Sequence, residues 1–68
     1  MRQVLIYPGE DSMWVAECPS LPGCISQGDS REEALLNIRE AIGPYVEALQ
    51  EDNLPVPAEH FEALLIAV

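Results

Sequence analysis

The sequence contains no lysine, and its only basic residues are Arg2, Arg31 and Arg39. Twelve aspartates and glutamates leave a net charge of −9 at pH 7. Proteins bind nucleic acids largely through lysine and arginine contacts to phosphates, so the composition argues against direct nucleic-acid binding. An acidic surface suits a basic protein partner, because complementary fields speed association. The same excess of acid would also simply keep a small protein soluble.

Long hydrophobic runs are also missing. The longest apolar run, residues 63–68, is far short of the roughly 20 residues that cross a bilayer, and no segment resembles a signal peptide. We therefore expect a cytoplasmic protein that does not associate with membranes. In a reducing cytoplasm a disulfide would not persist, so Cys18 and Cys24 are expected to be buried thiols. Together with the single His60 they lack the spacing of a metal site, and we expect no metal and no cofactor.

The chain has 68 residues, which predicts a single domain over 1–68. A chain of this size buries only about 60% of its unfolded surface, so its core alone stabilises it marginally. Self-association is a common compensation in small domains, and unpaired strand edges favour it. We therefore expect a homo-oligomer.

Three short strands are predicted in the first half of the chain. Residues 4–7 are rich in β-branched and aromatic side chains and stop at Pro8, and residues 13–17 form the return strand of a hairpin. Two prolines make residues 19–23 a connection, and residues 24–27 supply the third strand. Both faces of the second strand are largely apolar, so the alternation leaves open which face is buried.

A capped helix follows the third strand. Ser30 and Glu33 have the spacing of a capping box, and Asp29 and Glu32 place negative charge at the helix N-terminus. Beyond them, apolar residues recur at helical spacing: Leu35, Ile38, Ile42, Tyr45 or Val46, and Leu49. Pro44 follows Gly43 inside this pattern and lacks an amide hydrogen, so a kink or a break is expected there.

The last part of the chain is ambiguous. After the extended linker 54–57, residues 61–68 suit either a helix or a strand. A fourth strand beside the first would cover apolar surface that three strands and one helix leave exposed, so we favour a strand. The predicted fold is α+β, in the order β-β-β-α-β, with the helix packed on one face of an antiparallel sheet.

Acidic residues raise the possibility of catalysis. Asp11, Glu17, Asp29 and Glu32 could in principle approach one another, and clustered carboxylates bind Mg²⁺ or transfer protons. Nothing in their spacing requires this, since a turn or a helix terminus explains most of them. His60 lies in the proline-rich region, away from either cysteine in the sequence, so no nucleophile–base pair is indicated. We expect no catalytic residue and no enzyme activity.

The stretch from Trp14 to Ser30 resembles the HicB-like antitoxin family. The matching elements are a proline turn, a Ser-x-Gly-Asp-Ser approach to the helix, and an acidic helix start: Pro19-Ser20-Leu21-Pro22-Gly23, Ser26-Gln27-Gly28-Asp29-Ser30 and Glu32-Glu33-Ala34. The helix and the linker Leu54-Pro55-Val56-Pro57 are also similar to the family's. The resemblance covers nearly the whole chain.

This resemblance implies a partial RNase H-like domain that binds and silences a basic, mRNA-cleaving HicA-like toxin. The residues expected to contact the toxin are the acids near the hairpin and the helix start: Glu10, Asp11, Glu17, Asp29 and Glu32. Many members carry a further DNA-binding domain that represses their operon, which is not expected for residues 1–68. The alternatives are an orphan regulatory or ligand-binding oligomer, and a residual metal-dependent hydrolase.

Overall fold

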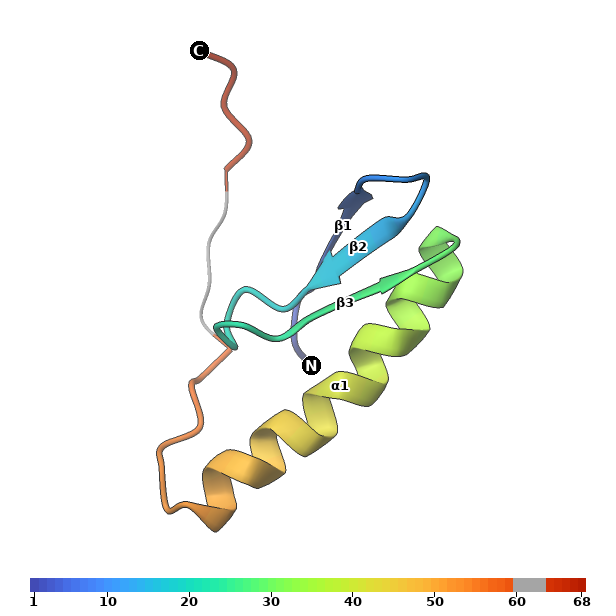
Figure 1. The fold of residues 1–68 in the computed structure, drawn as a ribbon. Helices are drawn as coiled ribbons and strands as arrows, with labels where there is room; N and C mark the ends of the chain where they lie inside the picture. Colours follow the sequence, from blue (N-terminus) through green and yellow to red (C-terminus); the bar gives the residue numbers. More distant parts are fainter. Residues whose placement is uncertain (60–63) are drawn as a thin grey trace.

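Three antiparallel strands and one long helix make up the fold of this computed structural model, which describes residues 1–59 and 64–68. The strands are β1 (Leu5–Pro8), β2 (Trp14–Glu17) and β3 (Ile25–Gly28), side by side in that order. Helix α1 (Arg31–Glu51) lies across one face of the sheet (Figure 1). The predicted α+β class and the order of these four elements are confirmed.

The pairing of the strands decides which side chains face the helix. Ala16 lies opposite both Ile6 and Ser26, and Ala16 is fully buried, so this row faces α1. The neighbouring row places Val15 between Tyr7 and Gln27, on the face away from α1. The face of β2 that the sequence left open is therefore settled by its contact with the helix.

The fully buried part of the core comes from β2, the connection between β2 and β3, and the first half of α1. The buried apolar residues are Ala16, Cys18, Leu21, Cys24, Ala34 and Ile38. Leu21 comes from the proline loop and is fully buried, so that loop is part of the core as well as a connection. Cys18 and Cys24 are both buried and not joined by a disulfide, as predicted.

The start of α1 follows the predicted capping box. The Ser30 side chain accepts a hydrogen bond from the Glu33 amide at 3.1 Å, while the Glu33 carboxylate accepts one from the Asp29 amide at 3.2 Å. Gly28, just before this cap, is required by close packing. A Cβ atom there would lie 2.6 Å from the Ala34 amide nitrogen, so no larger residue fits without moving the helix.

Of the kink or break predicted at Gly43 and Pro44, the break does not occur, because the helix continues through Pro44. Gly43 has no Cβ, so the usual crowding between a proline ring and the preceding side chain is absent. Pro44 and Glu40 are both exposed, which lets water satisfy the Glu40 carbonyl that loses its amide donor. On the other side, Tyr45 and Val46 pack against the core and hold the second half of the helix in place.

The end of α1 is a Schellman motif. Asn53 has a positive φ of 55°, its amide donates to the Gln50 carbonyl, and the Leu54 amide donates to the Leu49 carbonyl. Asparagine tolerates this left-handed conformation better than most residues. The extended linker predicted from residue 54 therefore follows directly on the end of the helix.

The predicted fourth strand is not found over residues 64–68, which have no regular secondary structure. The rest of that prediction, 61–63, lies outside the described residues. The Glu59 carboxylate accepts a hydrogen bond from the Gln3 amide, which places Glu59 beside the start of β1. Residues 64–68 are all exposed, so they do not pack against the edge of β1. Figure 1 shows residues 64–68 leading away from the sheet.

None of the helical residues described by the structure forms a segment both long and apolar enough to cross a membrane.

Candidate partner-binding surface

Four of the five predicted contact residues lie at one end of the sheet. Glu10 and Asp11 are in the turn between β1 and β2, and Asp29 and Glu32 lie at the start of α1. The strand register brings these two regions together, because Pro8 pairs with Trp14 and Trp14 pairs with Gly28. All four acids are exposed. We call Glu10, Asp11, Asp29 and Glu32 the acidic end.

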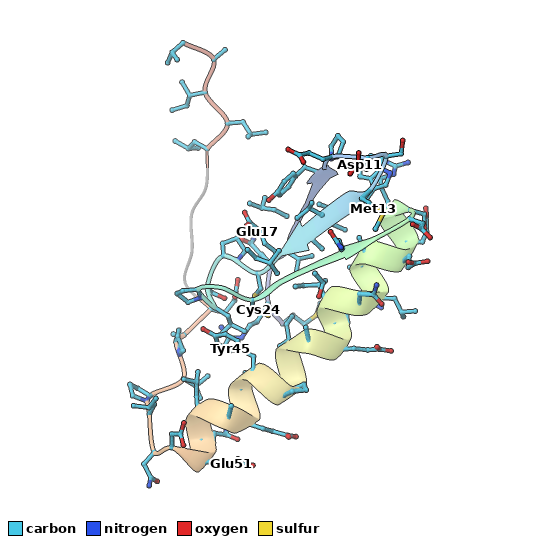
Figure 2. All side chains as sticks on the ribbon, in the orientation of Figure 1. Asp11, Met13, Glu17, Cys24, Tyr45 and Glu51 are labelled. Carbon is cyan, nitrogen blue, oxygen red and sulfur yellow. The ribbon has the colours of Figure 1, made fainter. Side chains whose placement is uncertain are left out.

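The backbone of the β1–β2 turn presents its acids outward. Asp11 and Ser12 have positive φ values of 56° and 62°, a conformation that aspartate adopts more readily than most residues. The turn is closed by hydrogen bonds from the Gly9 amide to the Met13 carbonyl at 2.7 Å and from the Met13 amide to the Glu10 carbonyl at 3.0 Å. Figure 2 shows Asp11 near the helix N-terminus and away from Glu51, at the opposite end of α1.

One cation lies within this end of the molecule. The Arg31 guanidinium is 5.4 Å from the centre of the Trp14 ring, a distance at which a cation is attracted to the ring face. Arg31 is the first residue of α1 and lies between Asp29 and Glu32 in the sequence. Glu33, in the first turn of α1, is also exposed, so this end of the molecule has five exposed carboxylates and a single guanidinium, which leaves it negative.

Glu17 lies elsewhere. It is at the far end of β2, paired with Leu5 and Ile25, so the structure does not bring it to the acidic end (Figure 2). It is half-buried on the sheet face that α1 leaves uncovered.

That uncovered face was missed by sequence reasoning as a possible contact surface. Its exposed apolar members are Leu5, Tyr7 and Ile25, with exposed fractions of 41%, 40% and 56%. Together with Val15 and Glu17 they give an apolar sheet face that has one carboxylate within it. The alternation of side chains along each strand is the signal in the sequence that could have identified this face. It did not do so, because both faces of β2 are largely apolar and the buried one could not be chosen.

A second group of residues missed by sequence reasoning joins the start of the chain and the segment after α1 to the proline loop. Ser20 donates to the Glu59 carboxylate at 2.6 Å and accepts from the Arg2 guanidinium at 3.0 Å. Arg2 also lies 3.6 Å from a Glu59 oxygen and donates to the Pro57 carbonyl at 2.7 Å. These contacts hold together three segments that are far apart in the sequence. No short-range spacing in the sequence predicts them.

These contacts favour the ionised form of Glu59. The hydrogen bond from Ser20, then that from the Gln3 amide, and the nearby Arg2 charge hold the pKa of the Glu59 carboxyl below its ordinary value. Arg2–Glu59 is the one ion pair among residues 1–59 and 64–68. The role of this group is structural, because its polar atoms bond to one another and so hold the three segments together.

The proline loop is also fixed to the helix. The Tyr45 hydroxyl donates a hydrogen bond of 2.6 Å to the Pro22 carbonyl. Within the loop, the Cys18 amide donates to the Cys24 carbonyl and the Cys24 amide to the Leu21 carbonyl, each at 3.0 Å. Burial, and then the neighbouring Cys18, raise the pKa of the Cys24 thiol. The loop is thus held by its own backbone hydrogen bonds and by Tyr45, and its two buried thiols are suited to packing.

Over the described part of the chain, no three residues among its histidines, cysteines, aspartates and glutamates are placed to hold a metal ion together.

Comparison with known families places these features in a wider group. The sequence model described as "HicB_like antitoxin of bacterial toxin-antitoxin system" matches residues 3–66. A UPF0150 protein of Thermoplasma acidophilum is 41% identical over 63 residues, covering 93% of this chain and 91% of that protein. A UPF0150 protein of Synechocystis is 50% identical over 56 residues, covering 82% of this chain and 71% of its own.

One solved structure shares the fold. The N-terminal domain of the Burkholderia pseudomallei antitoxin HicB superimposes with a TM-score of 0.68 at 29% identity, over 91% of this chain and 69% of that one. The match includes the three strands, the helix and their order, so the sheet and helix described above are the common scaffold.

Proposed function

The chain belongs to the HicB-like antitoxin family, and we propose on that basis that it binds a basic HicA-like toxin and blocks its mRNA-cleaving surface. The observation that carries this proposal is the acidic end, where one turn and one helix start bring its four exposed carboxylates together, with the exposed Glu33 beside them. A surface that binds the phosphates of RNA is basic, and an acidic partner can cover it.

The proposed contact residues are Glu10, Asp11, Asp29 and Glu32, with Glu17 on the adjoining sheet face. The first four lie on a turn and a capped helix start, both held by backbone hydrogen bonds. Their charges are therefore presented in a fixed arrangement, which lowers the ordering cost on binding. Glu17 differs, because Leu5 and Ile25 flank it, and we propose that it marks where the contact passes onto the apolar sheet face.

Binding to a purified HicA-like toxin tests this assignment. Replacing Glu10 and Asp29 together by lysine (Glu10→Lys, Asp29→Lys) reverses two charges at the acidic end. Glu47→Lys with Glu51→Lys makes the same change in net charge on exposed residues toward the end of α1. We expect the first pair to weaken binding by roughly tenfold or more, mostly through slower association, and the second pair to have a much smaller effect.

Salt provides the second measurement. The affinity of the unaltered chain should fall as ionic strength rises, because exposed charges are screened over about 10 Å at 0.1 M salt. Equal losses for the two pairs of variants would contradict the acidic end as the contact surface. A toxin that continues to cleave RNA in the presence of excess folded chain would contradict the antitoxin role itself.

We further propose that the protein acts in the cytoplasm, as a binding protein and not as an enzyme. The proposed mechanism is stoichiometric: one acidic surface occupies one basic surface and excludes RNA from it. This mechanism requires no covalent step, because an acidic surface that covers the basic surface of the toxin is enough to exclude RNA from it.

A further inference from the structure

We propose that residues 64–68 of one chain dock on a second copy of this chain, in the groove that lies beside β1. This inference concerns a different surface from the acidic end and does not depend on toxin binding. It rests on an exposed apolar segment, on an open groove at the start of an unpaired strand, and on the fact that the chain's own segment leaves this groove open.

The segment is apolar and fully open to solvent. Leu64, Leu65, Ile66 and Val68 are 83%, 104%, 72% and 121% exposed. Isolated apolar side chains on a surface are ordinary, but four within five residues form a contiguous patch, and such patches mark contact surfaces. The segment carries no charged side chain, so it can be buried without desolvating an ion.

The groove lies where the core is incompletely covered. α1 packs chiefly against β3 and least against β1, so the flank of the core beside β1 stays open. This flank is a groove of about 620 Å³. Its lining residues come from the segment before β1 and from one side of α1: Met1, Arg2, Val4, Leu35, Arg39 and Ile42.

The edge of β1, which begins one residue after the groove residue Val4, adds hydrogen-bonding capacity next to the groove. β1 is paired on one side only, with β2, and an unpaired strand edge accepts a further strand. An extended segment laid there gains backbone hydrogen bonds, and alternate side chains enter the neighbouring pockets. Residues 64–68 have the length of a β1-sized strand, which makes the two surfaces matched in size.

The chain's own segment leaves this groove open. Residues 64–68 are exposed, and none of them is among the residues that line the groove. In Figure 1 they lead away from the sheet, although Glu59 is held beside Gln3 and Ser20 at the start of β1. A second copy can supply a segment of the same sequence.

Charge favours this contact over other ways of joining two copies. Two chains of charge −9 repel wherever acidic surfaces meet. The groove contains no acidic side chain and has two of the three arginines, Arg2 and Arg39, at its margin. An uncharged segment in this groove keeps the acids of the two copies apart. Each copy carries one segment and one groove, so a reciprocal exchange closes into a two-fold dimer.

Sedimentation of the purified chain at micromolar concentration tests the proposal. We expect the unaltered chain to be a dimer and Leu65→Asp to raise its dissociation constant by roughly tenfold or more, because a buried contact then receives an unpaired charge. Leu36→Asp adds the same charge at a residue on α1 that is 56% exposed and outside the groove, and should leave the dimer intact. A monomeric wild-type chain, or equal effects of the two substitutions, would overturn the proposal.

Cross-linking separates exchange between copies from folding back within one copy. A chain with Val4→Cys is mixed with a chain of different mass with Ile66→Cys, and a short bis-maleimide is added. The native Cys18 and Cys24 are buried and serve as the background reaction. We expect a bridged product containing both chains, and much less of it when Ile25→Cys on the uncovered sheet face replaces Val4→Cys. Bridging only inside a chain that carries both new cysteines would overturn the exchange.

Discussion

The Tyr45 hydroxyl donates a hydrogen bond to the Pro22 carbonyl across 2.6 Å, which fixes the second half of α1 to the proline loop. The loop in turn inserts Leu21 into the core, where it is fully buried. The loop and the helix therefore stabilise each other, and the contact lies in the part of α1 that follows Pro44. This contact helps to explain why a proline inside the helix does not end it.

Removing this hydroxyl should destabilise the fold measurably. Tyr45→Phe keeps the ring that packs against the core and deletes one hydrogen bond, so we expect a loss of about 1 kcal/mol in the free energy of unfolding. Tyr7→Phe is the matched control, because Tyr7 is exposed on the uncovered sheet face and the described structure gives its hydroxyl no hydrogen bond. Urea denaturation of the three proteins provides the measurement. A similar loss in both variants would contradict the role given to the Tyr45–Pro22 contact.

Gly28 and Gly43 should respond differently to the same substitution. Gly28→Ala places a Cβ 2.6 Å from the Ala34 amide nitrogen and 2.9 Å from Glu33, so the start of α1 must shift. Overpacking of this kind costs about 1–3 kcal/mol. Gly43 has no atom within 4 Å of the added Cβ. There, the gain in helix propensity from alanine opposes its crowding by Pro44, and we expect a change within about 1 kcal/mol.

Thermal and urea unfolding of the two alanine variants, together with helix content by circular dichroism, check this pair. The informative quantity is the difference between them, since both changes add one methyl group. If Gly28→Ala were as stable as Gly43→Ala, the close approach between β3 and α1 would be wrong.

The parts of the fold that the sequence predicted well are set by neighbouring residues. The capping box needs only Ser30 and Glu33, and both hydrogen bonds form, although Glu33 reaches the Asp29 amide. The end of the helix at Asn53 likewise depends on a local left-handed turn. The family motifs also indicated the right scaffold, and Gly28 of the Ser-x-Gly-Asp-Ser motif lies where a Cβ would come within 2.6 Å of the Ala34 amide nitrogen.

The parts that the sequence could not settle depend on contacts between distant segments. Whether the helix continues past Pro44 depends in part on Tyr45, which packs on the core and bonds to a loop 23 residues earlier. The segment after α1 is held at Glu59, whose carboxylate accepts from the Gln3 amide across 56 residues. In the candidate surface, the register predicts that a turn and a helix start meet, but Glu17 is separated from them because β2 runs the length of the sheet.

The two thiols should be slow to react in the folded protein. Cys18 and Cys24 are buried, and the pKa of Cys24 is raised by burial and by Cys18, so little thiolate is available at neutral pH. We expect both to react with a thiol reagent much more slowly than in urea-unfolded protein. Titration with such a reagent, with and without urea, measures this directly. Fast labelling of both residues without urea would contradict the buried loop.

The Glu59 carboxylate should make stability depend on pH in the acid range. Its pKa is lowered in the folded state, so the ionised form stabilises the fold at pH values above the ordinary value of 4.5. The contribution is lost as the pH falls from that value through the lower folded one, because the proton then competes with Ser20, Gln3 and Arg2. Glu59→Gln removes the charge at every pH. We therefore expect the variant to be less stable than the wild type at pH 7 and the difference to shrink in acid.

Urea unfolding of both proteins between pH 7 and pH 3 gives this difference. Glu47→Gln removes the same charge from an exposed position on α1 and reports the effect of net charge alone. A gap between wild type and Glu59→Gln that stays constant down to pH 3 would mean that the Glu59 charge does not hold Arg2, Ser20 and the segment after α1 together. A gap that widens in acid would reverse the sign of the linkage and contradict the contacts at Glu59.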